Sequence, residues 1–140
     1  MNKTKNKDFL PEIKDVKMNI KIDVPTVNGH IYKKDVIEKS FREALETRLS
    51  INVTRNCDEL VGLYQQDPRN IIGRMKDFEI RENGDIILKI MPTLETELFD
   101  LFQATPVVMG VVEEGNIVNI YSVVGFFLSI DNDKILEGNN

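Results

Sequence analysis

Apolar and polar residues alternate near the start of the chain and predict its first strand. Every second residue is apolar across residues 16–24, at Val16, Met18, Ile20, Ile22 and Val24. This alternation is typical of a strand that buries one face and exposes the other. Pro25 follows directly and lacks a backbone N–H, so we expect it to end the strand.

Two segments show the 3.6-residue apolar period of a helix. In residues 35–49 one face carries Val36, Ile37, Ser40, Phe41, Ala44, Leu45 and Leu49, which predicts an amphipathic helix. Asp35 with Glu38 three residues later resembles a capping box at its start. Residues 94–103 predict a second, shorter helix after Thr93 as N-cap. Its expected buried stripe is Leu94, Leu98, Leu101 and Phe102.

Turn signals between apolar runs predict hairpins in the rest of the chain. Asn83-Gly84 lies between two such runs, and this dipeptide is a strong hairpin signal. Residues 113–116 (EEGN) separate two further runs in the same way. Residues 122–130 are almost continuously apolar, which predicts a strand buried on both faces. The sequence thus predicts strands at residues 50–54, 59–63, 71–80, 86–91, 107–112, 117–120 and 122–130.

The predicted fold class is α+β, with a mostly antiparallel sheet or small barrel and two helices. At 140 residues the chain has the usual size of one domain. We expect a flexible N-terminal arm at residues 1–15, one folded domain at 16–131 and a C-terminal tail at 132–140. The arm is polar, with lysines among Asn and Thr, but it also carries Phe9, Leu10 and Ile13. It is either a solvated tail or an arm that docks on a partner through these apolar residues.

Composition narrows the expected partners. The net charge is −5 and the hydrophobic content is 41%. A negative protein is a poor match for nucleic acid, whose phosphates require a basic surface. No apolar run reaches the length of a membrane span, and the polar N-terminal residues lack the apolar core of a signal peptide. We therefore expect neither membrane nor nucleic acid as partner, and synthesis in the cytoplasm.

Residues with catalytic chemistry are few. His30 is the only histidine and Cys57 the only cysteine, and acidic neighbours of Cys57 would raise its thiol pKa. No glycine-rich phosphate loop and no metal-ligand spacing is present. We expect no cofactor, no metal and no enzyme activity. The alternative that these residues leave open is a serine-type site in which His30 acts with Ser122 or Ser129.

One segment resembles a known family. Residues 28–39 (NGHIYKKDVIEK) resemble the N-terminal signature of tailed-phage prohead proteases, with His30 in place of an arginine. In that family a histidine loop, a hairpin, a short helix, a nucleophile strand and a closing strand follow in this order. Residues 60–68, 105–111 and 123–128 occupy the histidine loop, the nucleophile strand and the closing strand. The resemblance covers about residues 16–131 and implies a fold like that of herpesvirus assemblin.

The family's catalytic residues are not carried over. Gln66 and Asp67 stand before Pro68 where the histidine is expected, and Val108 and Met109 stand at the nucleophile position. The resemblance therefore implies a degenerate member. The degenerate catalytic positions are Gln66, Asp67 and Met109, and Phe9, Leu10 and Ile13 are the candidate partner-binding residues.

We expect a non-catalytic structural protein of the phage virion: an auxiliary or decoration protein of the capsid, or a head-assembly component. The expected partners are the major capsid protein, other head proteins or further copies of this chain, since virion proteins of this size often act as symmetric oligomers. Two alternatives remain at this stage. One is an active prohead maturation protease that uses an unrecognised site, and the other is a pseudoenzyme that regulates head assembly.

Overall fold

A computed structural model describes residues 12–47, 51–55, 71–93 and 98–131. These residues are mostly in strands, and they contain one α-helix. The elements in chain order are β1 (Lys14–Lys21), α2 (Lys34–Thr47), β2 (Asn52–Arg55), β3 (Ile71–Ile80), β4 (Asp85–Pro92), the 3₁₀ turn η2 (Leu98–Leu101), β5 (Phe102–Glu113), the 3₁₀ turn η3 (Glu114–Asn116) and β6 (Ile117–Ile130).

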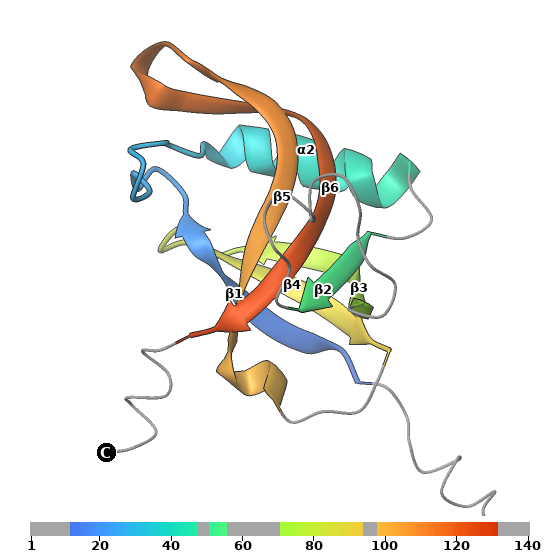
Figure 1. Ribbon diagram of the computed structural model, residues 1–140. Coiled ribbons are helices and arrows are strands. Elements are labelled where there is room, and N and C mark those ends of the chain that lie inside the picture. The colour runs from blue at the N-terminus through green and yellow to red at the C-terminus, as the bar shows by residue number, and fades with distance from the viewer. Residues whose placement is uncertain (1–11, 48–50, 56–70, 94–97, 132–140) are drawn as a thin grey trace, which may run out of the picture.

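The six strands close into a barrel in the order β1-β4-β3-β2-β6-β5 (Figure 1). Four neighbouring pairs are antiparallel, whereas β1 runs parallel to β5 and β2 runs parallel to β6. The parallel contacts are short. Met18 pairs with Ala104, and residues 53–55 pair with residues 126–128. Closure therefore depends on two short parallel seams, while long antiparallel ladders provide most of the pairing.

The alternation of β1 points its apolar residues into this barrel. Val16, Met18 and Ile20 are all buried, and the polar residues between them face solvent. β3 and β4 form the predicted hairpin, closed by a turn in which Gly84 has a positive φ of 95°. In β3, a Cβ on Gly73 would lie 2.5 Å from the Ile90 side chain, so glycine permits the close approach of β4.

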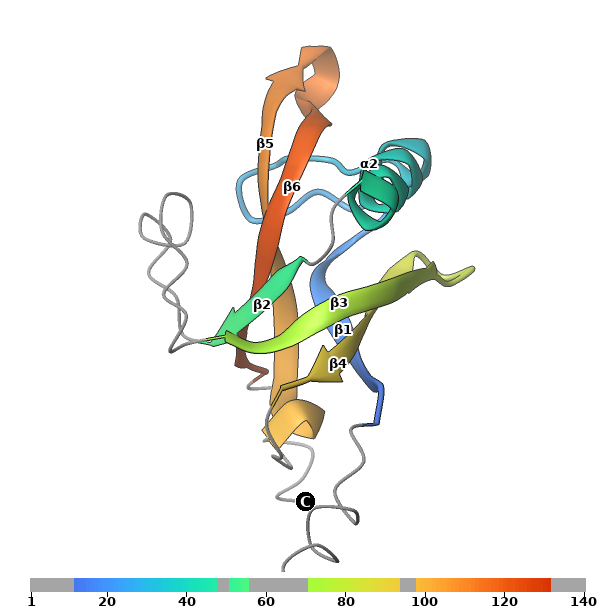
Figure 2. The ribbon, with the colours of Figure 1, turned by 90° about the vertical axis from the view of Figure 1, so that its right-hand side faces the viewer.

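β5 and β6 form a long hairpin that extends beyond the barrel, standing above the other strands in Figure 2. The ladder register shifts between Val107 and Val108 and again between Met109 and Gly110. At these shifts Val124 and Tyr121 of β6 are left without a cross-strand partner in β5. Such bulges bend a strand and increase its twist. The two bulges lie three residues apart, so they curve the hairpin over α2.

Helix α2 lies across the end of the barrel beneath this hairpin (Figures 1 and 2). Phe41 is fully buried, and its ring packs edge-on against two others at centroid distances of 5.3 Å to Phe78 in β3 and 5.4 Å to Phe126 in β6. Aromatic pairs favour this edge-to-face geometry. The Ser40 hydroxyl, also buried, donates to the Val36 carbonyl at 2.7 Å. The helix is thus held to the barrel by one aromatic cluster.

The fold class predicted from sequence is wrong. The described structure is a mostly β closed barrel with one α-helix, and is not an α+β arrangement with two helices. The helix predicted at residues 35–49 is confirmed as α2, with residues 48 and 49 outside the described part. The strands predicted at 117–120 and 122–130 are a single strand, β6.

The second helix, predicted at residues 94–103, does not form in the described part of that segment. Residues 98–101 make one 3₁₀ turn, and β5 begins at Phe102. Phe99 and Phe102 are both buried and pack edge-on, with centroids 6.1 Å apart. Nucleating a short helix is costly, whereas a strand from Phe102 onward pairs with β6 at every position to Glu113. The ladder therefore outweighs the helical spacing of the leucines.

Two further boundaries differ from expectation. β1 begins at Lys14, inside the segment assigned to the arm, and ends at Lys21 because the pairing with β4 ends there opposite Asp85. Asp23 adopts a positive φ of 64°, so the chain turns before Val24. β6 is not buried on both faces, since Ser122 and Ile130 are exposed. The rest of the arm, residues 1–11, and the tail at 132–140 lie outside the described residues.

Phe41→Ala tests the attachment of α2. Removing the ring leaves a cavity between β3, β6 and the helix, and we expect the free energy of unfolding to fall by about 3–5 kcal/mol. Glu38→Ala, on the exposed side of the same helix, should change it by less than about 0.5 kcal/mol. Urea denaturation followed by circular dichroism measures both. A loss below about 1 kcal/mol for Phe41→Ala would contradict this packing.

Candidate interaction surface

Met109 is the one degenerate catalytic position within the described residues. It lies on β5, opposite Ser122 of β6, and its side chain is 56% exposed. Gln66 and Asp67 lie outside the described residues, as do Cys57, Phe9 and Leu10. Ile13, the remaining candidate for partner binding, directly precedes β1 and is 44% exposed. The resemblance implies that Gln66 or Asp67 lies near Met109, and this stays a prediction.

His30 lies in a tight loop that joins β1 to α2. Its carbonyl accepts from the Thr26 N–H at 2.9 Å, and its own N–H donates to the Thr26 hydroxyl at 3.2 Å. The next residue, Ile31, forms a bridge to Ile117 at the start of β6. Its carbonyl accepts from the Val118 N–H, and its N–H donates to the Asn116 carbonyl. These bonds fasten the loop to the base of the hairpin turn.

The position of this loop determines how far His30 lies from Ser122 and Ser129, the two serines considered as its catalytic partners. Ser122 is five residues from Ile117 along β6, and Ser129 is twelve. At the usual rise of a strand these separations are about 16 Å and about 40 Å. A general base must lie within hydrogen-bond reach of its nucleophile. Ser129 is thus at the far end of β6 from His30, and Ser122 is well along the strand.

Tyr32 completes the segment that resembles the family signature. Burial raises the pKa of its phenol, because the charged form loses hydration. Its carbonyl accepts from the Asp23 N–H at 2.9 Å, and its side chain packs against the core. The segment therefore has a structural role in this chain: it closes the loop after β1 and docks that loop on β6.

Groups that bind metals or cross membranes are not found in the part of the chain that is described. No three His, Cys, Asp or Glu side chains there are arranged to hold a metal ion. Among the same residues no helix is both long enough and apolar enough to span a bilayer.

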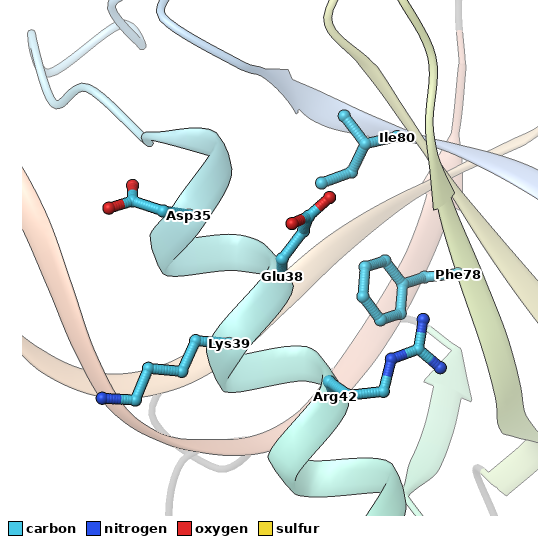
Figure 3. A pocket seen from close by; sticks show the side chains of 6 residues that line it. All are labelled: Asp35, Glu38, Lys39, Arg42, Phe78 and Ile80. Carbon is cyan, nitrogen blue, oxygen red and sulfur yellow. The ribbon is translucent and has the colours of Figure 1, made fainter.

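An open groove runs between α2 and β3 (Figure 3). Its lining residues are Asp35, Glu38, Lys39, Arg42, Phe78 and Ile80. The Arg42 guanidinium lies over the Phe78 ring, 4.7 Å from its centroid, and pairs with Asp77 at 3.2 Å. Arg42 thereby covers the floor of the groove and is itself neutralised. Of the charged residues that line the groove, Arg42 is therefore already paired with a neighbour outside it.

Exposed apolar side chains gather at the other side of α2. Eight large hydrophobic side chains are substantially exposed in the described residues, and six of them lie on the β5–β6 hairpin or the loop docked under it. These six are Val24, Val27, Met109, Val111, Val112 and Tyr121. We call this set the hairpin patch. Large apolar side chains that are exposed in one region of a soluble protein often mark interaction sites.

Tyr121 connects the patch to a groove between α2 and β6. The residue is 66% exposed and lines this groove with Lys39 and Glu43 of the helix and Asn119 of β6. The groove continues past Thr47 and Ser122. An exposed aromatic ring among charged and amide groups is a common anchor in protein interfaces. The patch and the groove form a continuous surface beside the hairpin.

The free edge of β5 is the second feature of this surface. β5 pairs with β1 only at Ala104, and from Thr105 to Glu113 its described strand partner is β6 alone. No charged residue occurs in residues 107–112. Sheet edges normally carry charges, prolines or short strands that prevent pairing with other chains. This edge has Pro106 at its beginning and two bulges of the ladder at Val107–Val108 and Met109–Gly110, but no charged residue until Glu113.

Sequence reasoning did not predict the patch. Val111 and Val112 belong to a run that was predicted as a strand, Tyr121 lies between two predicted strands, and all three are exposed. One signal was present: both strands flanking residues 113–116 are apolar on both faces. A hairpin with two apolar faces needs cover on each side, and the described residues provide one helix near it.

Comparisons with protein-family models, with curated protein sequences and with solved structures find no match to this chain. The resemblance to prohead proteases thus depends on the quoted residues and on the order of elements.

Gly110→Ala tests the geometry that shapes the patch. A Cβ at Gly110 would collide with the Asn119 carbonyl oxygen at the second bulge, so the strands must separate locally. We expect a loss of about 1–3 kcal/mol in the free energy of unfolding. Val111→Ala is the matched control, because its exposed side chain should cost less than about 0.5 kcal/mol. Equal stability of the two variants would show that the bulge is misplaced.

Proposed function

We propose that this protein is a non-catalytic structural protein of a tailed-phage head, either an auxiliary or decoration protein of the capsid or a component of head assembly. The single observation that supports a binding role best is the hairpin patch, whose members Met109, Val111 and Val112 are exposed on β5 where its described strand partner is β6 alone. The assignment to a phage head is supported by the resemblance of residues 28–39 and by the order of elements that follows them.

The chemistry around Met109 supports binding over catalysis. Its thioether carries no proton to transfer and is no general base. Ser122 lies opposite it with an exposed hydroxyl, but activation of a serine requires a base within hydrogen-bond reach. The histidine of the chain, His30, is tied into the loop at the other end of this stretch of β6. A position that is catalytic in the resembled family is here an exposed apolar contact residue.

The expected partner is a protein surface. The hairpin from Val107 to Val123 has no lysine or arginine, and its turn carries Glu113 and Glu114. A surface of this charge repels phosphate backbones. It suits an apolar strand or groove whose rim is neutral or basic. The arm residues Phe9, Leu10 and Ile13 remain a second proposed contact, and of these Ile13 directly precedes β1.

Mass spectrometry of phage heads tests this function. Heads would be purified on density gradients from the culture that carries the gene, and both precursor and mature particles analysed. We expect peptides of this chain in intact heads, in many copies relative to the major capsid protein. Absence from both kinds of particle would contradict a structural role. Self-cleavage of the purified chain, abolished by His30→Ala, would contradict the non-catalytic assignment.

A further inference from the structure

We propose that the free edge of β5 is a self-association surface, on which β5 of a second copy of this chain pairs antiparallel about a twofold axis at Gly110. This inference deepens the proposed function and rests on it, because it assigns a partner to the hairpin patch. The result would be a continuous sheet formed by two hairpins. Pairing of this kind adds a strand to an exposed sheet edge through backbone hydrogen bonds.

The edge is available over a defined length. β1 occupies it only at Ala104, where Met18 pairs in parallel, and Asn19 adds a side-chain bond to Thr105 at 2.8 Å. Beyond Met18 no residue of β1 pairs with β5, while β1 stays paired with β4 as far as Lys21. Pro106 follows and has no N–H to donate. From Val107 to Glu113 the chain has its backbone groups on that side available to another strand.

The register follows from the side chains of the edge. Antiparallel pairing about Gly110 places Val108 opposite Val112 of the second copy and Met109 opposite its Val111. Met109, Val111 and Val112 are between 43% and 56% exposed in the single chain, so each gains an apolar neighbour. The pairing also keeps the outer face of one hairpin beside the outer face of the other. Isologous contacts require such self-complementarity.

Charge favours the antiparallel orientation of the two copies. Parallel pairing would bring Glu113 and Glu114 of both copies together, and like charges directly opposite one another are destabilising. In the antiparallel register Glu113 of one copy lies opposite Val107 of the other, so the acidic turns of the two copies lie at opposite ends of the paired edges.

Analytical ultracentrifugation of the full chain tests the proposal. We expect a reversible dimer to form between about 1 μM and about 300 μM. Val111→Lys places a charge in the middle of the edge and should weaken dimerisation at least about tenfold. Ile130→Lys makes a similar substitution at an exposed isoleucine at the far end of β6, outside the hairpin patch, and should leave dimerisation unchanged. A monomeric wild type, or a Val111→Lys dimer as stable as the wild type, would overturn the proposal.

Disulfide crosslinking tests the register without relying on a destabilised variant. In a Cys57→Ser background, a Met109→Cys chain would be mixed with a Val111→Cys chain. Directly opposed residues lie close enough for a disulfide, whereas the diagonal neighbours in each variant alone are about 7–8 Å apart. We expect the mixture to crosslink several times faster than either variant alone. Equal rates in the three samples would exclude pairing about Gly110.

The two proposals fail in different ways. A monomeric chain that is nevertheless present in phage heads, and that loses its place there on Val111→Lys, would overturn self-association. It would identify the edge as a docking strand for another head protein and leave the proposed function standing. A dimer with the expected crosslinks in a protein absent from every particle would overturn the function and retain the inference.

Discussion

β6 is much longer than β2, the strand next to it in the barrel, and the rest of the structure depends on this difference in length. β6 has 14 residues, but β2 pairs with it only at residues 126–128. The other half of β6 leaves the barrel with β5 as its ladder partner. An apolar ribbon of this kind must be covered to be stable. Phe41 and its helix cover the concave side, where Val118, Ile120 and Val123 are buried. The bulges at Tyr121 and Val124 provide the curvature that this requires.

Helix α2 covers one face of the β5–β6 hairpin. The other face and the edge of β5 stay exposed, and the proposed function follows from this difference between the two faces. The bridge from Ile31 to Ile117 holds the end of the ribbon, so the exposed edge is positioned by backbone hydrogen bonds. Rigid presentation reduces the entropy lost when a partner binds. Gly110 is required for the close approach of Asn119 at the second bulge. The same features that complete the fold thus shape an interaction surface.

Local patterns predicted local structure well. The alternation from Val16, the apolar face around Phe41 and the Asn83-Gly84 turn each identified their element, since the signal lies within one segment. Closure of the barrel was not predictable in this way, because it depends on short parallel contacts such as Met18 with Ala104. The helical spacing of Leu98 and Leu101 led to a wrong helix prediction for the same reason. The strand partner of this segment lies more than 25 residues away, in β6. The exposure of the apolar side chains of Val111 and Tyr121 was not predicted. Of the predicted site residues, Met109 and Ile13 belong to the described part of the structure. Gln66, Asp67, Phe9 and Leu10 lie outside it.

Hydrogen–deuterium exchange of β5 at two protein concentrations tests the central claim most directly. Amides between Val107 and Glu113 that point away from β6 are open to solvent in the single chain and hydrogen-bonded in the dimer, and exchange reports this difference. We predict slower exchange in β5 at about 300 μM than at about 1 μM, with β4, which lies within the barrel, unchanged. Equal exchange of β5 at both concentrations, in protein that is otherwise folded, would contradict the account.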